Sequence, residues 1–168
     1  MNYHNITKDD MLNGDGLRVV LWVAGCTHRC PSCHNPETWD VFGGIPFDAV
    51  ARRELWEELR KDYVSGITFS GGDPLHPENI KEVEKLAREC KTQFPEKTIW
   101  LYTGYFWEDI RELPVIQWLD VLVDGPFVEA VKDNQLFWRG SKNQRVIDVK
   151  KSRELAEVVL YCASDDSL

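Results

Sequence analysis

Short apolar runs recur along the chain and alternate with segments of helical spacing. Within residues 18–24 the positions from Val19 onward are apolar in succession, which predicts a strand covered on both faces, as in a parallel sheet. Similar runs predict further strands at residues 66–70, 98–102, 118–123 and 146–149. Residues 1–17 are polar, and the Asn-Gly-Asp-Gly sequence at 13–16 predicts a turn.

Helical spacing is clearest in two longer segments. Residues 47–61 repeat apolar positions at this spacing, and Asp48 is suitably placed for the first turn. Residues 77–94 form the clearest predicted helix, which Pro77 can begin. Its apolar stripe consists of Ile80, Val83, Leu86, Ala87, Cys90 and Phe94. Shorter helices are predicted at residues 107–113 and 128–132.

The alternation of strands and helices predicts an α/β fold built from right-handed βαβ units. We expect one domain over residues 1–168, with a mostly parallel sheet flanked by helices. Four or five strands are too few for an eight-stranded barrel, so an open partial barrel or an open twisted sheet is expected. The segment 150–168 has no predicted role.

Composition narrows the classes of function. The chain has 168 residues, 43% of them hydrophobic, which suits one core, and a formal net charge of −8. That charge argues against a duplex-binding surface, so we expect no nucleic-acid partner. No apolar run approaches the roughly 18 residues of a membrane span, and residues 1–10 lack the layout of a secretory signal. We therefore expect a cytoplasmic protein whose thiols stay reduced and serve as metal or redox groups.

Three of the five cysteines, Cys26, Cys30 and Cys33, lie within eight residues directly after the first predicted buried strand. A zinc site with His28 or His34 as fourth ligand is one interpretation, but structural zinc sites usually combine two separated ligand pairs. A cubane iron–sulfur cluster with three protein thiolates would leave one iron open to an outside ligand. The clustering in one loop favours the iron–sulfur cluster.

The other unusual loops also follow strand ends. Ser-Gly-Gly-Asp at residues 70–73 follows the second strand, Thr103 the third and Asp124 the fourth. In parallel α/β sheets ligands bind at this edge, so we expect one composite site. Two glycines let a ligand approach the backbone, and Asp73 could face an ammonium group, whereas Asp124 could equally be a turn residue.

Two of these motifs together resemble a known signature. Cys26-x3-Cys30-x2-Cys33 is similar to the cluster motif of radical S-adenosylmethionine (SAM) enzymes, and Ser-Gly-Gly-Asp-Pro at 70–74 resembles their SAM-contact loop. Within that superfamily the chain most resembles the family that activates anaerobic ribonucleoside-triphosphate reductases. The resembling segments run in order from residue 1 to about 149 and are Met-Asn-Tyr-His (1–4), Asn-Gly (13–14), Gly-Cys (25–26), Cys-Pro (30–31), Ser-Gly-Gly-Asp-Pro-Leu-His-Pro (70–77), Thr-Gly-Tyr (103–105), Val-Leu-Val-Asp-Gly (121–125) and Trp-Arg-Gly-Ser-x-Asn-Gln (138–144).

The resemblance implies a partial (β/α) barrel of the radical SAM type. It implies a [4Fe–4S] cluster on Cys26, Cys30 and Cys33, with SAM chelating the open iron. An electron from reduced flavodoxin or a similar donor would cleave SAM to methionine and a 5′-deoxyadenosyl radical. That radical would take hydrogen from a backbone glycine of the reductase and leave a glycyl radical there.

The resemblance also implies the SAM contacts. The segment from Ser32 through Cys33 to His34, together with Gly72, would line SAM through backbone groups, and Asp73 is a candidate for its amino group. We expect no general acid or base, because the cofactor carries the chemistry. Many superfamily members have an aromatic residue against adenine where this chain has Ser32. The base would then be held by backbone groups or by His34, which could instead be a solvent-facing loop residue.

The other cysteines and the segment around Trp138 can be explained by ordinary structural roles as well as by functional ones. Cys90 lies on an apolar helical stripe and is expected in the core, and Cys162 is expected to be a free thiol. Trp138 and the polar residues 139–145 either contact the partner or form an ordinary loop. Other functions stay open: a different glycyl-radical activase, a radical SAM enzyme acting on a metabolite, a zinc module, or an iron–sulfur electron carrier.

Overall fold

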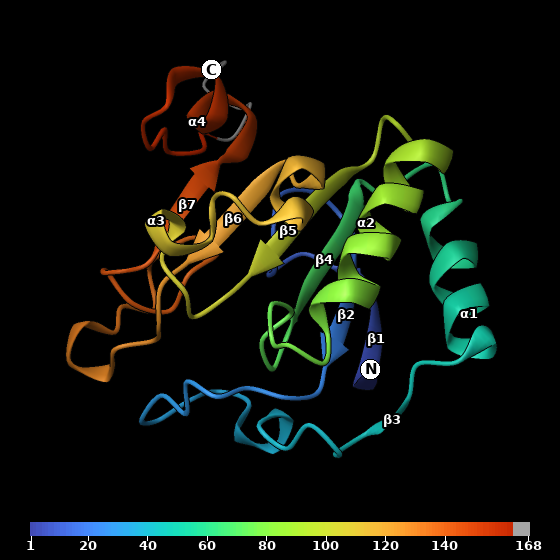
Figure 1. The fold of residues 1–168 in the computed structure, drawn as a ribbon, viewed down its shortest axis with the longest axis horizontal. Helices are drawn as coiled ribbons and strands as arrows, with labels where there is room; N and C mark the ends of the chain where they lie inside the picture. Colours follow the sequence, from blue (N-terminus) through green and yellow to red (C-terminus); the bar gives the residue numbers. More distant parts are fainter. Residues whose placement is uncertain (163–168) are drawn as a thin grey trace.

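The computed structural model describes residues 1–162, whose strands form one seven-stranded sheet in the order β3-β1-β2-β4-β5-β6-β7 (Figure 1). The strands are β1 Asn2–Asp10, β2 Arg18–Val23, β3 Ile45–Pro46, β4 Gly66–Gly71, β5 Thr98–Tyr102, β6 Val121–Asp124 and β7 Arg145–Asp148. The helices are α1 Ala49–Leu59, α2 Ile80–Gln93, α3 Trp107–Ile110 and α4 Val149–Leu155. Three 3₁₀ turns are η1 Pro36–Thr38, η2 Pro114–Trp118 and η3 Glu129–Val131. The α/β class is as expected.

The sheet is mixed, so the expectation of a mostly parallel sheet is confirmed for its central strands only. The central strands β2, β4, β5 and β6 are parallel neighbours. The β1–β2, β1–β3 and β6–β7 pairs are antiparallel. Antiparallel neighbours need only a short connection, and the turn predicted at 13–16 supplies one between β1 and β2.

Strand β1 lies in the segment that the sequence presented only as polar. Tyr3 and Ile6 are buried, at 8% and 7% exposure, whereas most of their neighbours in β1 are half-buried or exposed. A strand with one face on the core and one near solvent needs few apolar residues. The hydrophobic pattern of residues 1–17 is therefore too sparse to indicate it.

Helices α1 and α2 cover one face of the sheet, where they lie side by side (Figure 1). Asp48 caps α1 by accepting hydrogen bonds from the backbone N–H groups of Val50 and Ala51. Helix α2 begins at Ile80, three residues later than Pro77, because His76 and Asn79 lie in turns that precede it. The predicted stripe of α2 is confirmed, and Cys90 is fully buried in the core.

The predicted strand at 118–123 starts later than expected. Pro114 opens the 3₁₀ turn η2, which extends to Trp118, and the strand begins at Val121. The fixed φ of proline suits the start of such a turn. The hydrophobic run thus contains the end of a helical turn followed by a strand.

The segment after residue 149 has structure of its own. Helix α4 ends at Leu155, and Leu160 then forms an antiparallel bridge with Ile147 of β7. The backbone N–H of Tyr161 donates to the carbonyl of Val146 at 2.9 Å. The rest of the predicted tail, residues 163–168, lies outside the described residues.

The face of the sheet opposite α1 and α2, here called the inner face, carries a second apolar cluster. Its buried members are Trp100, Val121, Val123 and Val146. The Tyr161 ring packs on Trp100 and Trp138, with centroids 5.2 and 5.8 Å away. Its hydroxyl donates to the Asp15 carboxylate at 3.0 Å. Burial and this bond raise the pKa of Tyr161 to about 12.

A buried guanidinium completes the inner face at the end away from the cysteines. Arg18 is fully buried at the start of β2 and donates to Thr68 Oγ1 and the Ile67 carbonyl, each at 2.7 Å. Its guanidinium carbon lies 5.4 Å from the centroid of the Trp100 ring. Burial lowers the pKa of Arg18 to about 10.

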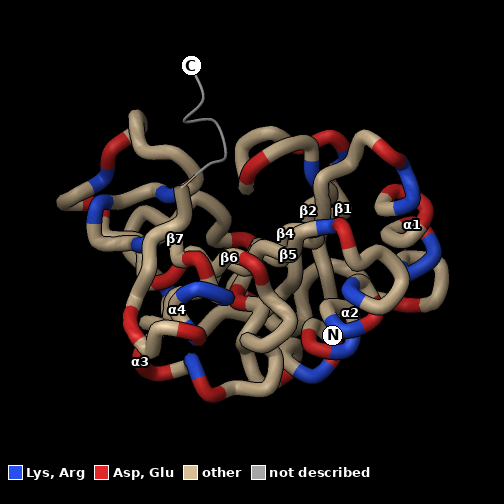
Figure 2. The backbone as a smooth tube through the Cα atoms, turned by 90° about the horizontal axis from the view of Figure 1, so that it is seen from above, with Lys and Arg blue, Asp and Glu red and all other residues tan. Residues whose placement is uncertain are grey.

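Charged residues of both signs are interspersed around the molecule (Figure 2). Among residues 1–162, no helix has the length and apolar character needed to cross a membrane.

Candidate functional site

Four loops meet at one edge of the sheet, as expected. They follow β2, β4, β5 and β6, which are parallel neighbours and therefore end at the same edge. The loop after β2 carries Cys26, Cys30 and Cys33, and the loop after β4 carries Gly72 and Asp73. The composite site predicted from the sequence thus has a common location.

The cysteine loop is held to the sheet at its two ends. The N–H of Gly25 donates to the Thr38 carbonyl at 2.7 Å, and that of Cys26 to the Trp39 carbonyl at 3.1 Å. Cys26, Cys30 and Cys33 are all free and partly exposed. Burial raises the pKa of the Cys26 thiol, although a backbone hydrogen bond at His28 opposes this.

The thiols form the donor set of the site. Residues 1–162 contain no group of three or more His, Cys, Asp or Glu side chains placed around a single ion. In a cubane cluster each cysteine binds a different iron, so its ligands need not converge on one point. Three unpaired thiols on one anchored loop, each with some exposure, fit such a cluster.

Gly72 joins the glycine-rich loop closely to the cysteine loop. Its N–H donates to the Val23 carbonyl at 2.8 Å, and the N–H of Asp73 donates to the Gly25 carbonyl at 2.7 Å. A Cβ on Gly72 would lie 2.5 Å from the oxygen of Gly25 and 2.9 Å from that of Thr38. Glycine is required here because backbone atoms occupy the space of any side chain.

Asp73 is bonded within the protein. It is 2% exposed, and its carboxylate accepts hydrogen bonds from the Thr103 hydroxyl at 2.9 Å and from the Gly104 N–H at 3.0 Å. The backbone N–H of Leu75 donates to Oδ1 at 2.9 Å. His28 Nε2 lies 2.8 Å from Oδ2, but its N–H direction is not aligned with that oxygen. A ligand ammonium could bond to this carboxylate only by displacing one of these groups.

A groove of about 460 Å³ opens at this edge of the sheet. Its lining is Leu12, Asn13, Trp22, Cys33, His34, Asn35, Ser70, Tyr102, Phe127, Asp133, Asn134, Leu136, Trp138, Arg139, Gly140 and Gln144. Of the predicted site residues, Cys33 and His34 line the groove, whereas the others do not: Cys26, Cys30, Ser32, Gly72 and Asp73.

Two groove residues have features that the sequence did not indicate. The exposed His34 ring lies against Phe127, with centroids 5.0 Å apart. The Tyr102 hydroxyl is buried and has no hydrogen-bond partner among residues 1–162, and burial raises its pKa strongly. An unpartnered buried hydroxyl in a groove wall is a group that a bound molecule can satisfy.

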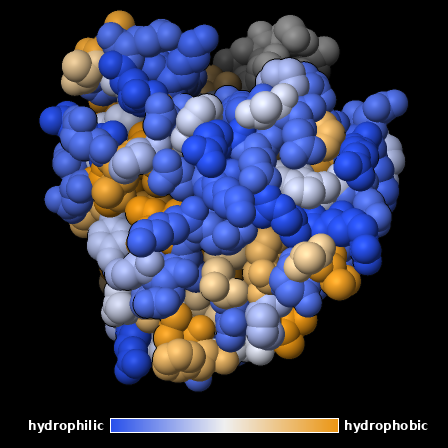
Figure 3. All heavy atoms as spheres, turned by 45° about the vertical axis from the view of Figure 1, so that its right-hand side comes forward, coloured by the Kyte–Doolittle hydropathy of each residue, from blue (hydrophilic) through white to orange (hydrophobic). Residues whose placement is uncertain are grey.

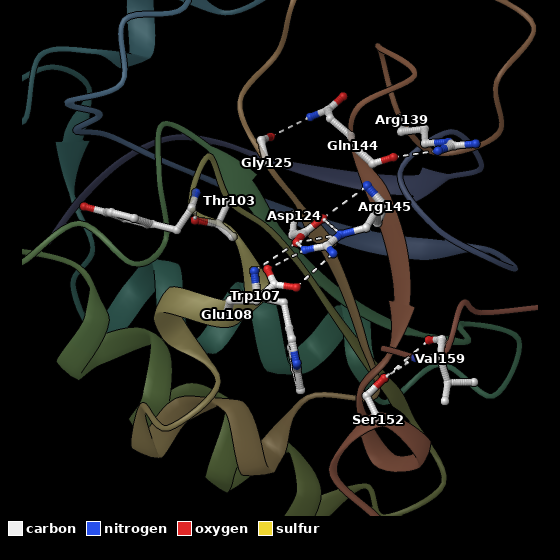
Figure 4. Close-up of polar contacts among 11 residues, drawn as sticks. Thr103, Trp107, Glu108, Asp124, Gly125, Arg139, Gln144, Arg145, Ser152 and Val159 are labelled. Carbon is white, nitrogen blue, oxygen red and sulfur yellow. Dashed lines mark hydrogen bonds and ion pairs between the residues drawn. The ribbon is translucent and has the colours of Figure 1, made fainter. Parts of the chain in front are cut away.

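Asp124 anchors the far side of the site through bonds within the protein (Figure 4). It is fully buried, accepts a hydrogen bond from the Trp107 N–H at 2.9 Å, and pairs with Arg145, which also binds Glu108. The bonds to Glu108 and Asp124 raise the pKa of Arg145, and the bond to Arg145 lowers that of Glu108. Asp124 is the last residue of β6 rather than a turn residue, and its carboxylate is occupied by bonds within the protein.

The segment 138–145 forms one wall of the groove and is held in place by its own hydrogen bonds. Gln144 Nε2 donates to the Gly125 carbonyl at 3.0 Å (Figure 4). Its Oε1 accepts from the Gly140 N–H at 2.9 Å. Arg139 donates to the Gln144 carbonyl at 2.5 Å. These contacts tie the loop after β6 to the segment that enters β7.

Comparison with known proteins identifies the family. Residues 12–147 match the family described as "4Fe-4S single cluster domain". A relative named anaerobic ribonucleoside-triphosphate reductase-activating protein, from Enterobacteria phage T4, is 45% identical over 87% of this chain and 93% of its own. Proteins of the same name are 42% identical in Escherichia coli K12, over 87% of this chain and 97% of theirs, and 38% in Haemophilus influenzae, over 86% and 96%. This chain belongs to the anaerobic ribonucleoside-triphosphate reductase-activating protein family.

Membership in the activating-protein family confirms the resemblance found in the sequence. The match to a [4Fe–4S] single-cluster family supports an iron–sulfur cluster over zinc. Sequence reasoning missed Phe127 and Tyr102, and it considered His28 only as a possible zinc ligand rather than as the neighbour of Asp73. Only their positions beside the cysteine loop or at a strand end could have indicated them, because their roles depend on contacts between distant segments.

Proposed function

We propose that this chain activates an anaerobic ribonucleoside-triphosphate reductase as a radical SAM oxidoreductase. In this proposal Cys26, Cys30 and Cys33 hold a [4Fe–4S] cluster, and SAM binds beside it within a partial barrel of the radical SAM type. When bound, the cluster and SAM supply reductive cleavage to a 5′-deoxyadenosyl radical, which removes hydrogen from a backbone glycine of the reductase. Reduced flavodoxin or a similar protein donates the electron.

The observation that carries the proposal is the position of Cys33 in the groove wall. Three thiolates leave one corner of a cubane without a protein ligand. Cys33 lines a groove of about 460 Å³, which is in the size range of small-molecule sites. The groove is also open to solvent, so SAM and a segment of another protein can both approach the cluster.

The chain's own residues position these components. Gly72 brings the glycine-rich loop against the backbone of the cysteine loop, where its neighbours can contact SAM through main-chain groups. Asp73 holds Thr103 and Gly104 at the same edge. His34 and Ser32 flank Cys33, and His34 with Phe127 forms part of the groove wall. Trp22 and Tyr102, from the ends of two strands, line the groove on the side of the sheet.

Anaerobic reconstitution with iron and sulfide, followed by reduction with dithionite, tests the proposal. We expect methionine and 5′-deoxyadenosine from SAM and, with the reductase present, a glycyl-radical doublet in the EPR spectrum. Cys30→Ala should abolish both, whereas Cys162→Ala, at an exposed thiol that does not line the groove, should retain both.

The same experiment separates the alternatives. An intact cluster without SAM cleavage would exclude the proposal. Zinc without iron or acid-labile sulfide in anaerobically purified protein would instead indicate a zinc module. SAM cleavage without a doublet on the reductase would indicate a radical SAM enzyme with another substrate.

A further inference from the structure

The loop formed by residues 133–140, here called the 133–140 loop, separates the groove from a second hollow. Its two ends are held together by the Lys132–Ser141 bridge and by the Asp133 N–H, which donates to the Gly140 carbonyl at 3.2 Å. Trp138 has a φ of 59°, in the left-handed region, and its indole packs against Trp100 of the inner face. Such a conformation is held by its surroundings, so the loop is a defined wall.

The second hollow is apolar and has a volume of about 480 Å³. Phe137 and Leu160 lie on its rim and are 80% and 57% exposed. Val146 and Tyr161 form part of its base. A large aromatic side chain and a leucine exposed beside an apolar hollow are typical of an interaction surface.

The two hollows form one continuous surface. Leu136, Trp138 and Arg139 of the 133–140 loop line both of them. The groove reaches Cys33, so a molecule bound in the second hollow lies directly beside the opening that leads to the cysteines. The 133–140 loop is therefore the wall that the groove and the second hollow share.

The proposed substrate is a glycine within a folded protein, so the partner is a whole protein subunit and not a short peptide. A short segment in the groove cannot by itself fix the position of a whole subunit, and protein interfaces depend on a few buried aromatic or aliphatic anchors. The face on the α1 and α2 side is mostly hydrophilic, with scattered hydrophobic patches, and is a poorer candidate for such an anchor (Figure 3).

We propose that Phe137 and Leu160 form a docking surface for the glycyl-radical subunit of the reductase, which inserts an apolar side chain into the second hollow while its glycine segment enters the groove. This proposal rests on the proposed function for the identity of the partner. It assigns binding to residues that do not line the groove, so docking and SAM chemistry are separable by mutation.

The test is affinity for the reductase, measured by anaerobic calorimetry with the reconstituted protein. Phe137→Ala combined with Leu160→Ala should weaken binding about tenfold or more, which is the loss typical of interface anchors. Val50→Ala is the matched control, because Val50 is 59% exposed on α1 and should leave affinity unchanged. SAM cleavage by dithionite without the reductase should be the same in all three proteins. Both mutated side chains are largely exposed, so circular dichroism should show unchanged folding.

The outcomes distinguish this surface from its alternatives. Unchanged affinity in the double variant, or no measurable binding by the wild type, would overturn the docking surface. Sedimentation that shows a wild-type dimer and a monomeric double variant, with unchanged affinity for the reductase, would also overturn it in favour of a second copy of this chain. If the wild type cleaves no SAM but binds the reductase through Phe137 and Leu160, the proposed function fails and the docking surface stands.

Discussion

Thr103 and Asp73 connect two strand ends of the site, because the Thr103 hydroxyl donates to the buried Asp73 carboxylate at 2.9 Å. The same carboxylate accepts from the Gly104 N–H and lies beside His28 of the cysteine loop. One acidic side chain therefore fixes the ends of β4 and β5 relative to the cysteines.

We predict that Asp73→Asn destabilises the protein by about 1–3 kcal/mol. The amide NH₂ would face either the Leu75 N–H or the Gly104 N–H, which donate to different oxygens of Asp73, so one buried backbone donor would lose its acceptor. The Thr103 hydroxyl can instead turn to accept from the amide. Urea unfolding of the cluster-free protein measures the change. Asp62→Asn, at an exposed site, is the control and should stay within about 0.5 kcal/mol. Equal stabilities of the two variants would contradict the assigned role of Asp73.

The Asp124–Arg145 pair should matter more for stability than the Glu108–Arg145 pair. Asp124 is fully buried, whereas the Glu108 side chain is 56% exposed. Asp124→Ala should cost on the order of 2–3 kcal/mol, because Arg145 keeps some solvent contact and its bond to Glu108. Glu108→Gln should cost under about 1 kcal/mol. Denaturant unfolding of both variants measures the two losses of stability. A larger loss for Glu108→Gln than for Asp124→Ala would contradict this prediction.

Gly72→Ala should separate the glycine-rich loop from the cysteine loop. The new Cβ would lie 2.5 Å from the Gly25 oxygen, and backbone on that side cannot move as a flexible side chain can. We expect a loss of stability of about 1–3 kcal/mol and a lower iron content after anaerobic reconstitution. Gly43→Ala is the control, since its nearest atom would be 3.1 Å away. Normal iron content and stability in Gly72→Ala would show that the loops can separate without consequence.

The buried thiol of Cys90 predicts a specific loss of stability at alkaline pH. Burial raises the pKa of Cys90 to about 11 from an ordinary 9.0, so the unfolded chain releases this proton first as the pH rises. Stability should fall between pH 9 and about 11, by up to about 1.4 kcal/mol for each pH unit, and the loss should level off above that range.

Comparison with Cys90→Ala isolates the contribution of this thiol. The variant creates a cavity whose cost does not depend on pH, while the tyrosines titrate alike in both proteins. The difference in unfolding free energy between wild type and Cys90→Ala should therefore shrink from pH 9 to 11. A constant difference across that range would contradict the raised pKa.

The sequence predicted the common edge of the site better than the bonds within it. Continuous apolar runs located β2, β4 and β5 because both faces of these central strands are buried. The same logic missed β1, which needs only residues such as Tyr3 and Ile6 on one face. The cysteine spacing indicated the cluster loop because its ligands are adjacent in the chain.

The bonds of the two acidic residues could not be predicted, since they join distant parts of the chain. Asp73 was placed correctly at a strand end, but its partner Thr103 is 30 residues away. Asp124 was left between two roles, and its partner Arg145 is 21 residues away and comes from another strand. Residue type and local spacing do not say which distant donor a carboxylate will meet.

The bond between Tyr161 and Asp15 supports one wall of the groove that reaches Cys33. Tyr161 packs on Trp100 and Trp138, and Arg18 lies against Trp100. Trp138 in turn lines the groove together with Cys33. An anchor between residues 15 and 161, which are far apart in the chain, therefore shapes the space that a segment of another chain meets beside Cys33.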